Sequence, residues 1–361
     1  MPARTTLALA LGAAAVVAGV AAAAQSITAV SWGGAYTLSQ IKAYHEPFTE
    51  ATGIVVYSQD YHGGLQEIRA QVQAGRVTWD LVDVALSDAI RGCEEGLLEP
   101  IDHSRLPPAP DGTPAVEDFI AGTLTECGVG QIVWSTIYAY DETRFSDDEP
   151  ATIADFFDTK RYPGKRGLRK TPQVNLEWAL LADGVPIHRV YEVLNTTQGI
   201  DRAFAKLATL KPDLVWWEAG AQPPHMLADG EVIMTSAYNG RIFNAQISEN
   251  QSFKIVWDSQ VWDIDLWVIP KGSKNLGAAL EFVKFSTDTQ RLADQAKYIS
   301  YGPVRKSSLN LVTTHAQAGM DMQSHMPTAP ENFRNALQID FTFWAANGDE
   351  LNRRFNTWLT E

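Results

Sequence analysis

Two carboxylates lie two residues apart inside a strongly apolar stretch of the chain. Asp263 and Asp265 fall within residues 260–272, which otherwise read as one nearly continuous apolar strand that ends at a proline. Side chains alternate across a strand, so both carboxylates project to the same side. A buried carboxylate without a partner is unfavourable enough to require a counter-charge, a solvated cleft or a raised pKa. Two interpretations stay open: the wet face of an edge strand, or one wall of a ligand cleft.

Further aromatic and charged residues lie at the ends of other predicted strands, which is where ligands bind in open α/β sheets. They are Trp32, Tyr36, Tyr61, Arg169, Thr171, Trp217, Tyr238 and Arg241. Glycines beside Trp32 and Tyr61 would let a ligand or another part of the chain approach the backbone closely. Together with Asp263 and Asp265, these eight residues form the predicted ligand-binding set.

The motifs of several common enzyme classes are absent from the sequence. It has no Gly-x-x-x-x-Gly-Lys loop, no His-Glu-x-x-His, no Gly-x-Ser-x-Gly elbow and no Gly-x-Gly-x-x-Gly after a strand. The seven histidines are scattered, and none pairs with another at ligand spacing. We therefore expect no catalysis, no cofactor and no resident metal. Two alternatives stay open: an enzyme with an unfamiliar set of side chains, and metal capture by Tyr36, Tyr61, His62 and Tyr238.

Strands and helices alternate along the chain in a way that predicts how these side chains are positioned. Short strands and helices alternate over residues 27–85, which is typical of a parallel sheet covered by helices on both faces. Two long apolar strands, at 131–140 and 262–269, are predicted to cross between two α/β lobes and to form a hinge. The predicted parts are a first lobe of 25–134 and 262–312, a second lobe of 135–261, and a C-terminal helical segment of 313–361 that packs on the lobes.

The charge and the N-terminus indicate where the protein acts. Its 361 residues carry a formal net charge of −14, which argues against a nucleic acid or an anionic membrane surface as the partner. Arg4, an apolar run over 7–23 and the small residues 22–24 have the plan of a cleaved signal peptide spanning 1–24. We therefore expect an exported, periplasmic protein, and we expect it to be a monomer.

Export gives the cysteines a structural interpretation. Cys93 and Cys127 are the only two cysteines in the sequence. In an oxidising compartment such a pair favours a disulfide, whereas a metal or catalytic site would need further ligands at suitable spacing. The sequence therefore predicts a disulfide between Cys93 and Cys127.

Several stretches of the chain resemble the periplasmic solute-binding proteins of ABC importers, and in particular their spermidine/putrescine-binding group. The matching stretches are 32–36, 48–54, 79–82, 162–165, 227–232, 238–240 and 264–271. The resemblance runs from about Ile27 to about Pro303. It implies a type II fold, in which two hinge-crossing strands join two lobes that close on a ligand. It also implies that the protein delivers a small solute to permease subunits in the inner membrane, without making or breaking bonds.

The resemblance assigns roles to individual residues and favours a polyamine-like amine as the ligand. By position, Trp32 and Tyr36 are similar to the first-lobe aromatic residues of the family, and Tyr238 stands where the second lobe offers a tryptophan. Asp265 stands where an aspartate of the family pairs with an ammonium group. Cations bind well over aromatic faces, and a carboxylate in a closed cleft gives a charge-assisted hydrogen bond.

Other residues depart from the polyamine-binding pattern. Arg169 follows a second-lobe strand where the family places acidic residues, Arg241 follows Tyr238, and Asp263 falls where the family has a hinge-strand tryptophan. Basic residues suit a ligand that carries a carboxylate. The alternative ligand is therefore a small carboxylate or zwitterion, such as a hydroxy acid, an amino acid or a betaine.

Overall fold

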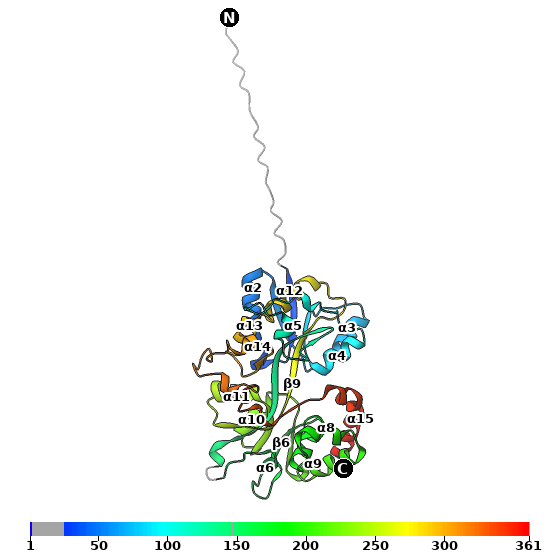
Figure 1. Ribbon diagram of the computed structural model, residues 1–361, viewed down its shortest axis with the longest axis vertical. Helices are drawn as coiled ribbons and strands as arrows, with labels where there is room; N and C mark the ends of the chain where they lie inside the picture. Colours follow the sequence, from blue (N-terminus) through cyan, green and yellow to red (C-terminus); the bar gives the residue numbers. More distant parts are fainter. Residues whose placement is uncertain (2–24, 146–147, 361) are drawn as a thin grey trace.

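The computed structural model describes residues 1, 25–145 and 148–360 (Figure 1). Apart from Met1, the predicted signal peptide at 1–24 lies outside the described residues. Within these ranges, none of the helices combines the length and the apolar character that crossing a bilayer requires.

One mixed sheet runs through both lobes. Its main strands, in spatial order, are β2 (Val55–Asp60), β1 (Ser26–Ser31), β3 (Leu81–Ala85), β9 (Phe253–Val268), β5 (Gly128–Asp141), β8 (Met234–Tyr238), β6 (Arg166–Arg169) and β7 (Leu214–Trp217). Strand β1 pairs in parallel with β2 and β3, and β6 pairs in parallel with β7 and β8. The predicted parallel α/β arrangement is thus present at both ends of the sheet. Between them lie the long antiparallel strands β5 and β9.

Helices cover the sheet in two groups, one above and one below the middle of β9 in Figure 1. The upper group is α1 (Gly34–Gln40), α2 (Glu46–Thr52), α3 (Gln66–Gln73), α4 (Leu86–Glu94), α5 (Ala115–Asp118), α12 (Leu276–Ser286), α13 (Thr289–Gln295) and α14 (Lys306–Leu309). The lower group is α6 (Ile153–Phe157), α7 (Asn175–Ala182), α8 (Val190–Leu194), α9 (Thr197–Ala208), α10 (Gln222–Ala228), α11 (Asn239–Ser248) and α15 (Phe341–Thr360). The predicted two-lobed α/β fold is confirmed.

Each lobe has its own hydrophobic core, and β5 and β9 contribute to both. On β5, Val133 packs in the first-lobe core and Tyr138 in the second-lobe core. On β9, Val261 packs in the second-lobe core and Ile264 in the first-lobe core. We therefore propose that the chain crosses between the lobes near the predicted boundaries of 134/135 and 261/262.

The C-terminal segment is less helical than predicted. Helix α15 begins only at Phe341, and residues 313–340 contain 3-10 turns and the strand β11 (Ala336–Gln338), which pairs with β9. The backbone of β9 near Gln260 has hydrogen-bonding groups that β11 satisfies. This long-range pairing outweighs the local helical pattern of residues 336–338. Helix α15 buries Phe343, Trp344 and Phe355 in the second-lobe core and also contacts α4 of the first lobe.

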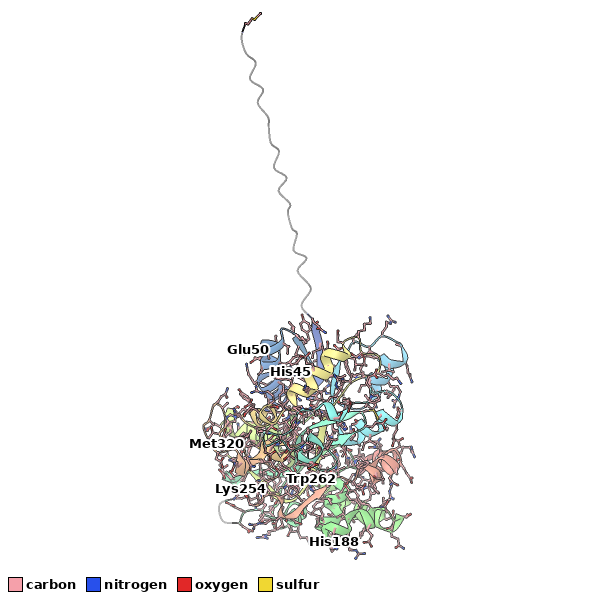
Figure 2. The ribbon with its side chains drawn as sticks, turned by 45° about the horizontal axis from the view of Figure 1, so that its top comes forward. His45, Glu50, His188, Lys254, Trp262 and Met320 are labelled. Atoms are coloured by element: carbon pink, nitrogen blue, oxygen red, sulfur yellow. A yellow bond between two sulfur atoms is a disulfide. The ribbon has the colours of Figure 1, made fainter. Side chains whose placement is uncertain are left out.

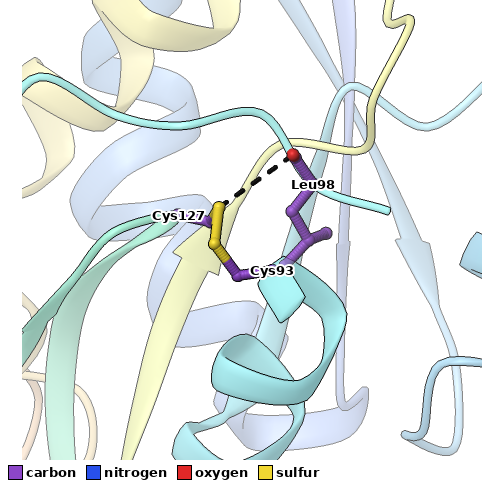
Figure 3. Close-up of a disulfide and its surroundings, with 3 residues drawn as sticks. All are labelled: Cys93, Leu98 and Cys127. Atoms are coloured by element: carbon purple, nitrogen blue, oxygen red, sulfur yellow. Dashed lines mark hydrogen bonds between the residues drawn. A yellow bond between two sulfur atoms is a disulfide. The ribbon is translucent and has the colours of Figure 1, made fainter. Parts of the chain in front are cut away.

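The predicted disulfide is present in the first lobe. Cys93 lies at the end of α4, and Cys127 directly precedes β5; their Cα atoms are 5.6 Å apart. Figure 3 shows the bridge beside Leu98. It ties the helix that follows β3 to the start of a hinge strand.

A π-helical turn, Ile41–His45, joins α1 to α2 in the first lobe and buries His45. Figure 2 labels His45 in the first lobe. Its ring packs against that of Phe282, with the ring centroids 5.6 Å apart. Neither ring nitrogen has a hydrogen-bond partner among the described residues. Burial therefore lowers the pKa of His45 to about 4, so that the imidazole is neutral near pH 7.

Candidate functional site

A cavity of about 320 Å³ lies between the lobes, and it has the size of a small-ligand site. The residues lining it come from both lobes and from the hinge strands. They are Trp32, Gly33, Gly34, Tyr36, Asp60, Tyr61, His62, Ala85, Ser87, Trp134, Arg169, Gln173, Glu218, Ala219, Gly220, Ala221, Tyr238, Arg241, Asp263, Asp265 and Tyr301.

The two carboxylates of β9 form the hinge-side wall of this cavity. Asp263 and Asp265 are each only 4% exposed, and both line the cavity, which confirms that they project to the same side. Asp263 Oδ1 accepts a hydrogen bond from the backbone N–H of Ile264 at 2.8 Å. Asp265 Oδ1 accepts one from Trp134 Nε1 at 2.7 Å. The cavity-facing wall is thus acidic, and a ligand with an ammonium group would fit it.

Burial raises the pKa of both carboxyl groups, and neither of them pairs with a basic side chain among the described residues. Burial raises the pKa of Asp263 to about 7. For Asp265, burial and the nearby Asp83 raise the pKa well above its usual range. Asp83 on β3 is itself fully buried, and burial raises its pKa to about 7 although Gln40 and Ser31 donate hydrogen bonds to it. The cluster therefore favours protons or an ammonium group as its counter-charge.

Aromatic rings surround the acidic wall. Trp32 lies against Tyr61 at a centroid distance of 5.1 Å, and Trp134 meets Tyr238 edge to face at the same distance. Tyr36 meets Tyr301 edge to face at 5.3 Å. Such faces can hold both an ammonium group and the methylene chain of a ligand.

Two arginines of the second lobe also line the cavity. Arg169 is the last residue of β6, and its guanidinium carbon lies 5.9 Å from the ring centroid of Tyr238 and 6.0 Å from that of Trp217. Arg241 extends from α11, and its Nη2 donates to the carbonyl oxygen of Gly33 at 2.9 Å. Among the described residues, neither arginine forms an ion pair with a carboxylate, whereas the neighbouring Lys170 pairs with Glu218 at 3.1 Å. The two guanidinium groups are therefore available to an anionic group.

Eight of the ten predicted ligand-binding residues line the cavity, and Thr171 and Trp217 do not. Trp217 is 1% exposed, and its Nε1 donates to Ser236 Oγ at 3.0 Å, so its ring fills the second-lobe core behind Arg169. The backbone N–H of Thr171 donates to the carbonyl oxygen of Arg169 at 2.8 Å, which turns this loop back on itself. Both residues therefore support Arg169 instead of lining the cavity.

The sequence interpretation missed several lining residues, chiefly Asp60, Trp134, Gln173, Glu218 and Tyr301. Trp134 lies inside a predicted strand, and only its pairing opposite Asp263 on β9 brings it to the site. Asp60 ends β2, so the strand-end rule could have found it. Tyr301 comes from a turn far along the chain and carried no signal of this kind.

Residues 25–145 and 148–360 contain no group of three or more His, Cys, Asp or Glu side chains arranged to hold a metal ion.

Comparisons with known proteins agree with a ligand-binding cleft. The family model for bacterial extracellular solute-binding proteins matches residues 43–327. A γ-aminobutyric acid (GABA)-binding protein of Pseudomonas aeruginosa is 44% identical over 334 residues, which cover 92% of this chain and 91% of the relative.

Two solved structures are similar over nearly their whole length. The PBP MotA of A. tumefaciens B6 in complex with glucopine has a TM-score of 0.82 and 29% identity, covering 93% of this chain and 100% of that one. The Atu4243-GABA receptor has a TM-score of 0.78 and 32% identity, covering 93% and 98%.

Proposed function

The chain belongs to the bacterial extracellular solute-binding proteins, and from that premise we propose that it captures a small zwitterion of the GABA type between its lobes. Membership of this family makes the protein the solute-binding component of an ABC importer and not an enzyme. Beyond this role, we propose the ligand class, the residues that contact the ligand and the compartment in which the protein acts.

The observation that carries the proposal is that acidic and basic side chains line one cavity and form no ion pair with each other among the described residues. Asp263 and Asp265 line the hinge-side wall, whereas Arg169 and Arg241 line the second-lobe wall. Desolvated charges are strongly unfavourable until they are paired. An ω-amino acid carries an ammonium group at one end and a carboxylate at the other, so it can form charge-assisted hydrogen bonds with both walls at once.

A polyamine can pair with the carboxylates of the cavity but not with its arginines. A diamine would pair with Asp265 but would bring its second ammonium group towards Arg169 and Arg241. A simple carboxylate would leave Asp263 and Asp265 without a counter-charge. The relatives also favour the zwitterion, since two of them are described as binding GABA. The zwitterion therefore replaces the polyamine-like amine that the family resemblance first favoured.

Aromatic side chains complete the proposed site. Trp32, Tyr36 and Tyr238 line the cavity between the two charged walls. We expect their faces to pack on the methylene chain and to stabilise the ammonium group by cation–π attraction.

We further propose that the protein acts in the periplasm as a monomer and passes its ligand to permease subunits in the inner membrane. The signal-peptide pattern of residues 1–24 and the extracellular family support this location. Closure of the two lobes around the ligand would be stabilised by contacts that only the closed form makes.

A thermal-shift screen on the purified protein tests the ligand class. Bound solute is first removed by partial unfolding and dialysis, and GABA, putrescine, butyrate and betaine are then compared. A ligand at 100 times its Kd stabilises the folded form by about 2.7 kcal/mol, which raises the melting temperature by several degrees. We expect the largest rise with GABA. A larger rise with putrescine would contradict the proposal and restore the polyamine assignment.

A further inference from the structure

Arg241 bridges the two lobes beside the candidate site. It belongs to α11 of the second lobe, and its Nη2 donates to the carbonyl oxygens of Gly33, at 2.9 Å, and of Trp32, at 3.4 Å. These carbonyl groups lie in the first-lobe turn between β1 and α1. One edge of the guanidinium group is therefore committed to holding this turn of the opposite lobe.

The conformation of the turn makes this approach possible. Gly33 and Gly34 have φ values of 76° and 60°, a region that favours glycine. A Cβ atom at Gly34 would lie 2.6 Å from Arg241 Nη1, so a side chain there would clash with the guanidinium group. Because Gly33 and Gly34 have no side chains, the guanidinium group of Arg241 can contact the backbone of the turn directly.

The Nε atom of the same guanidinium group has no hydrogen-bond partner among the described residues. Arg241 Nε is buried and makes no hydrogen bond with any described residue, yet Arg241 lines the cavity that Asp265 also lines. A buried donor on a charged group is unfavourable when it is left unsatisfied. A planar guanidinium group can bind a carboxylate through one edge while its remaining donor serves another acceptor.

We propose that Arg241 makes closure of the lobes depend on the carboxylate of the ligand. Its Nη2 holds the first-lobe turn at Trp32 and Gly33, and its Nε side takes the ligand carboxylate, so the two contacts are made by one rigid group. This inference rests on the proposed zwitterionic ligand. It implies that an amine without a carboxylate can occupy the acidic wall without stabilising the closed form.

Arg169 provides the matched comparison within the same cavity. Its guanidinium group lies among the rings of Trp217 and Tyr238, which both belong to the second lobe. It makes no hydrogen bond to the first lobe among the described residues. Arg169 should therefore contribute to affinity for the carboxylate without linking that affinity to closure.

Small-angle X-ray scattering at saturating ligand tests the coupling, with saturation verified by calorimetry. For the wild type we expect GABA, but not butylamine, to reduce the radius of gyration. Arg241→Gln should bind GABA about 10-fold to 100-fold more weakly and should not contract even when saturated. Arg169→Gln should lose a similar factor in affinity and still contract. Arg241→Lys, with a single ammonium group, should contract less than the wild type.

The outcomes separate this inference from the proposed function. Absence of GABA binding to the wild type would overturn the ligand class, and the coupling with it. Binding of GABA with full contraction of saturated Arg241→Gln would overturn the coupling alone. Contraction of the wild type by butylamine would also overturn the coupling alone. This measurement uses only the wild type, so it remains informative even if the Arg241 variants do not fold. Arg202→Gln, which alters a surface pair with Asp183, should behave as the wild type.

Discussion

At the scale of single residues, we propose that recognition of the ammonium group depends most on Asp265. It is 4% exposed, it lines the cavity, and one of its oxygens is held by Trp134 at 2.7 Å. That hydrogen bond orients the carboxyl group and leaves its other oxygen for a ligand. Asp263, two residues earlier on the same face, supports the same negative wall.

Replacing Asp265 by asparagine should therefore weaken GABA binding by about 10-fold to 100-fold, since a hydrogen bond to a charged group contributes about 1.5 to 3 kcal/mol. Asparagine keeps an acceptor for Trp134 and has nearly the same shape as the protonated carboxyl group, so the melting temperature of the ligand-free protein should not fall. Isothermal titration calorimetry measures the affinity. Asp229→Asn, on the exposed surface, is the control. Unchanged affinity in Asp265→Asn would show that the carboxylate is not a ligand contact.

Buried carboxyl groups at the site should make binding depend on pH. Burial raises the pKa of Asp263 to about 7, and the pKa of Asp265 is also raised by burial and by Asp83. Below their folded-state pKa these groups are protonated and cannot pair with an ammonium group, so GABA affinity should increase as pH rises from 5 to 8. Binding near pH 7 should release protons, which titrations in buffers of different ionisation enthalpy will count. Affinity that is constant over this range would contradict the assignment.

The same shifts predict how the ligand-free protein responds to pH. A folded-state pKa raised above the unfolded value adds stability at low pH, and that stability is lost as pH rises through the folded-state value. Burial raises the pKa values of Asp263 and Asp83 to about 7. The free energy of unfolding of the ligand-free protein should therefore fall as pH rises from 5 to 8. Urea unfolding in the presence and absence of GABA measures this. The increase in the free energy of unfolding that GABA causes should become larger as pH rises from 5 to 8. A smaller increase at higher pH would contradict the proposed pairing of the ionised carboxylates with GABA.

At the scale of elements, the disulfide anchors one end of the hinge. Cys93 and Cys127 are 34 residues apart in sequence, and their bridge joins α4 to the start of β5. Closing a loop of this length restricts the unfolded chain, so reduction should lower the free energy of unfolding by about 2 to 4 kcal/mol. Urea unfolding with and without reductant measures the difference. The double variant Cys93→Ser, Cys127→Ser should match the reduced protein, and insensitivity to reductant would count against the bridge.

The elements also show what local sequence pattern can and cannot predict. Runs of apolar residues located the strands that became β1, β3, β5 and β9, because these strands are largely buried. Strand ends then located Trp32 and Arg169, since parallel strands present their carboxyl ends at one edge. Trp134 could not be placed, because its position depends on the pairing of β5 with β9 across more than a hundred residues. Residues 336–338 likewise form β11 through contact with β9 and not through their own pattern.

At the scale of the whole molecule, two cores are joined by the long strands β5 and β9, which is the arrangement that the proposed closure of the lobes requires. The cavity lies where they face each other, and Arg241 and Asn239 of α11 both reach backbone carbonyl groups of the first lobe, at Gly33 and Ser300. A ligand shifts such an equilibrium only by its difference in affinity for the open and closed forms. The contacts of Arg241 define where that difference can arise.

Net charge provides a test that separates the two ligand classes. The protein carries a formal charge of −14, which attracts cations over long distances. A zwitterion has no net charge, so the association rate of GABA should change little when salt rises from about 10 mM to 500 mM. A polyamine should associate more slowly as salt screens the attraction. Stopped-flow tryptophan fluorescence measures both rates, and a steep salt dependence for GABA would contradict recognition of the zwitterion.

The most direct test of the account is a calorimetric comparison of GABA with the analogues that lack one of its charges. Butylamine retains the ammonium group, butyrate retains the carboxylate, and both preserve the length of the chain. If Asp265 and the arginines act on opposite ends of one ligand, GABA should bind at least about 10-fold more tightly than either analogue. Binding of butylamine or butyrate as tight as that of GABA would show that only one wall of the cavity recognises the ligand.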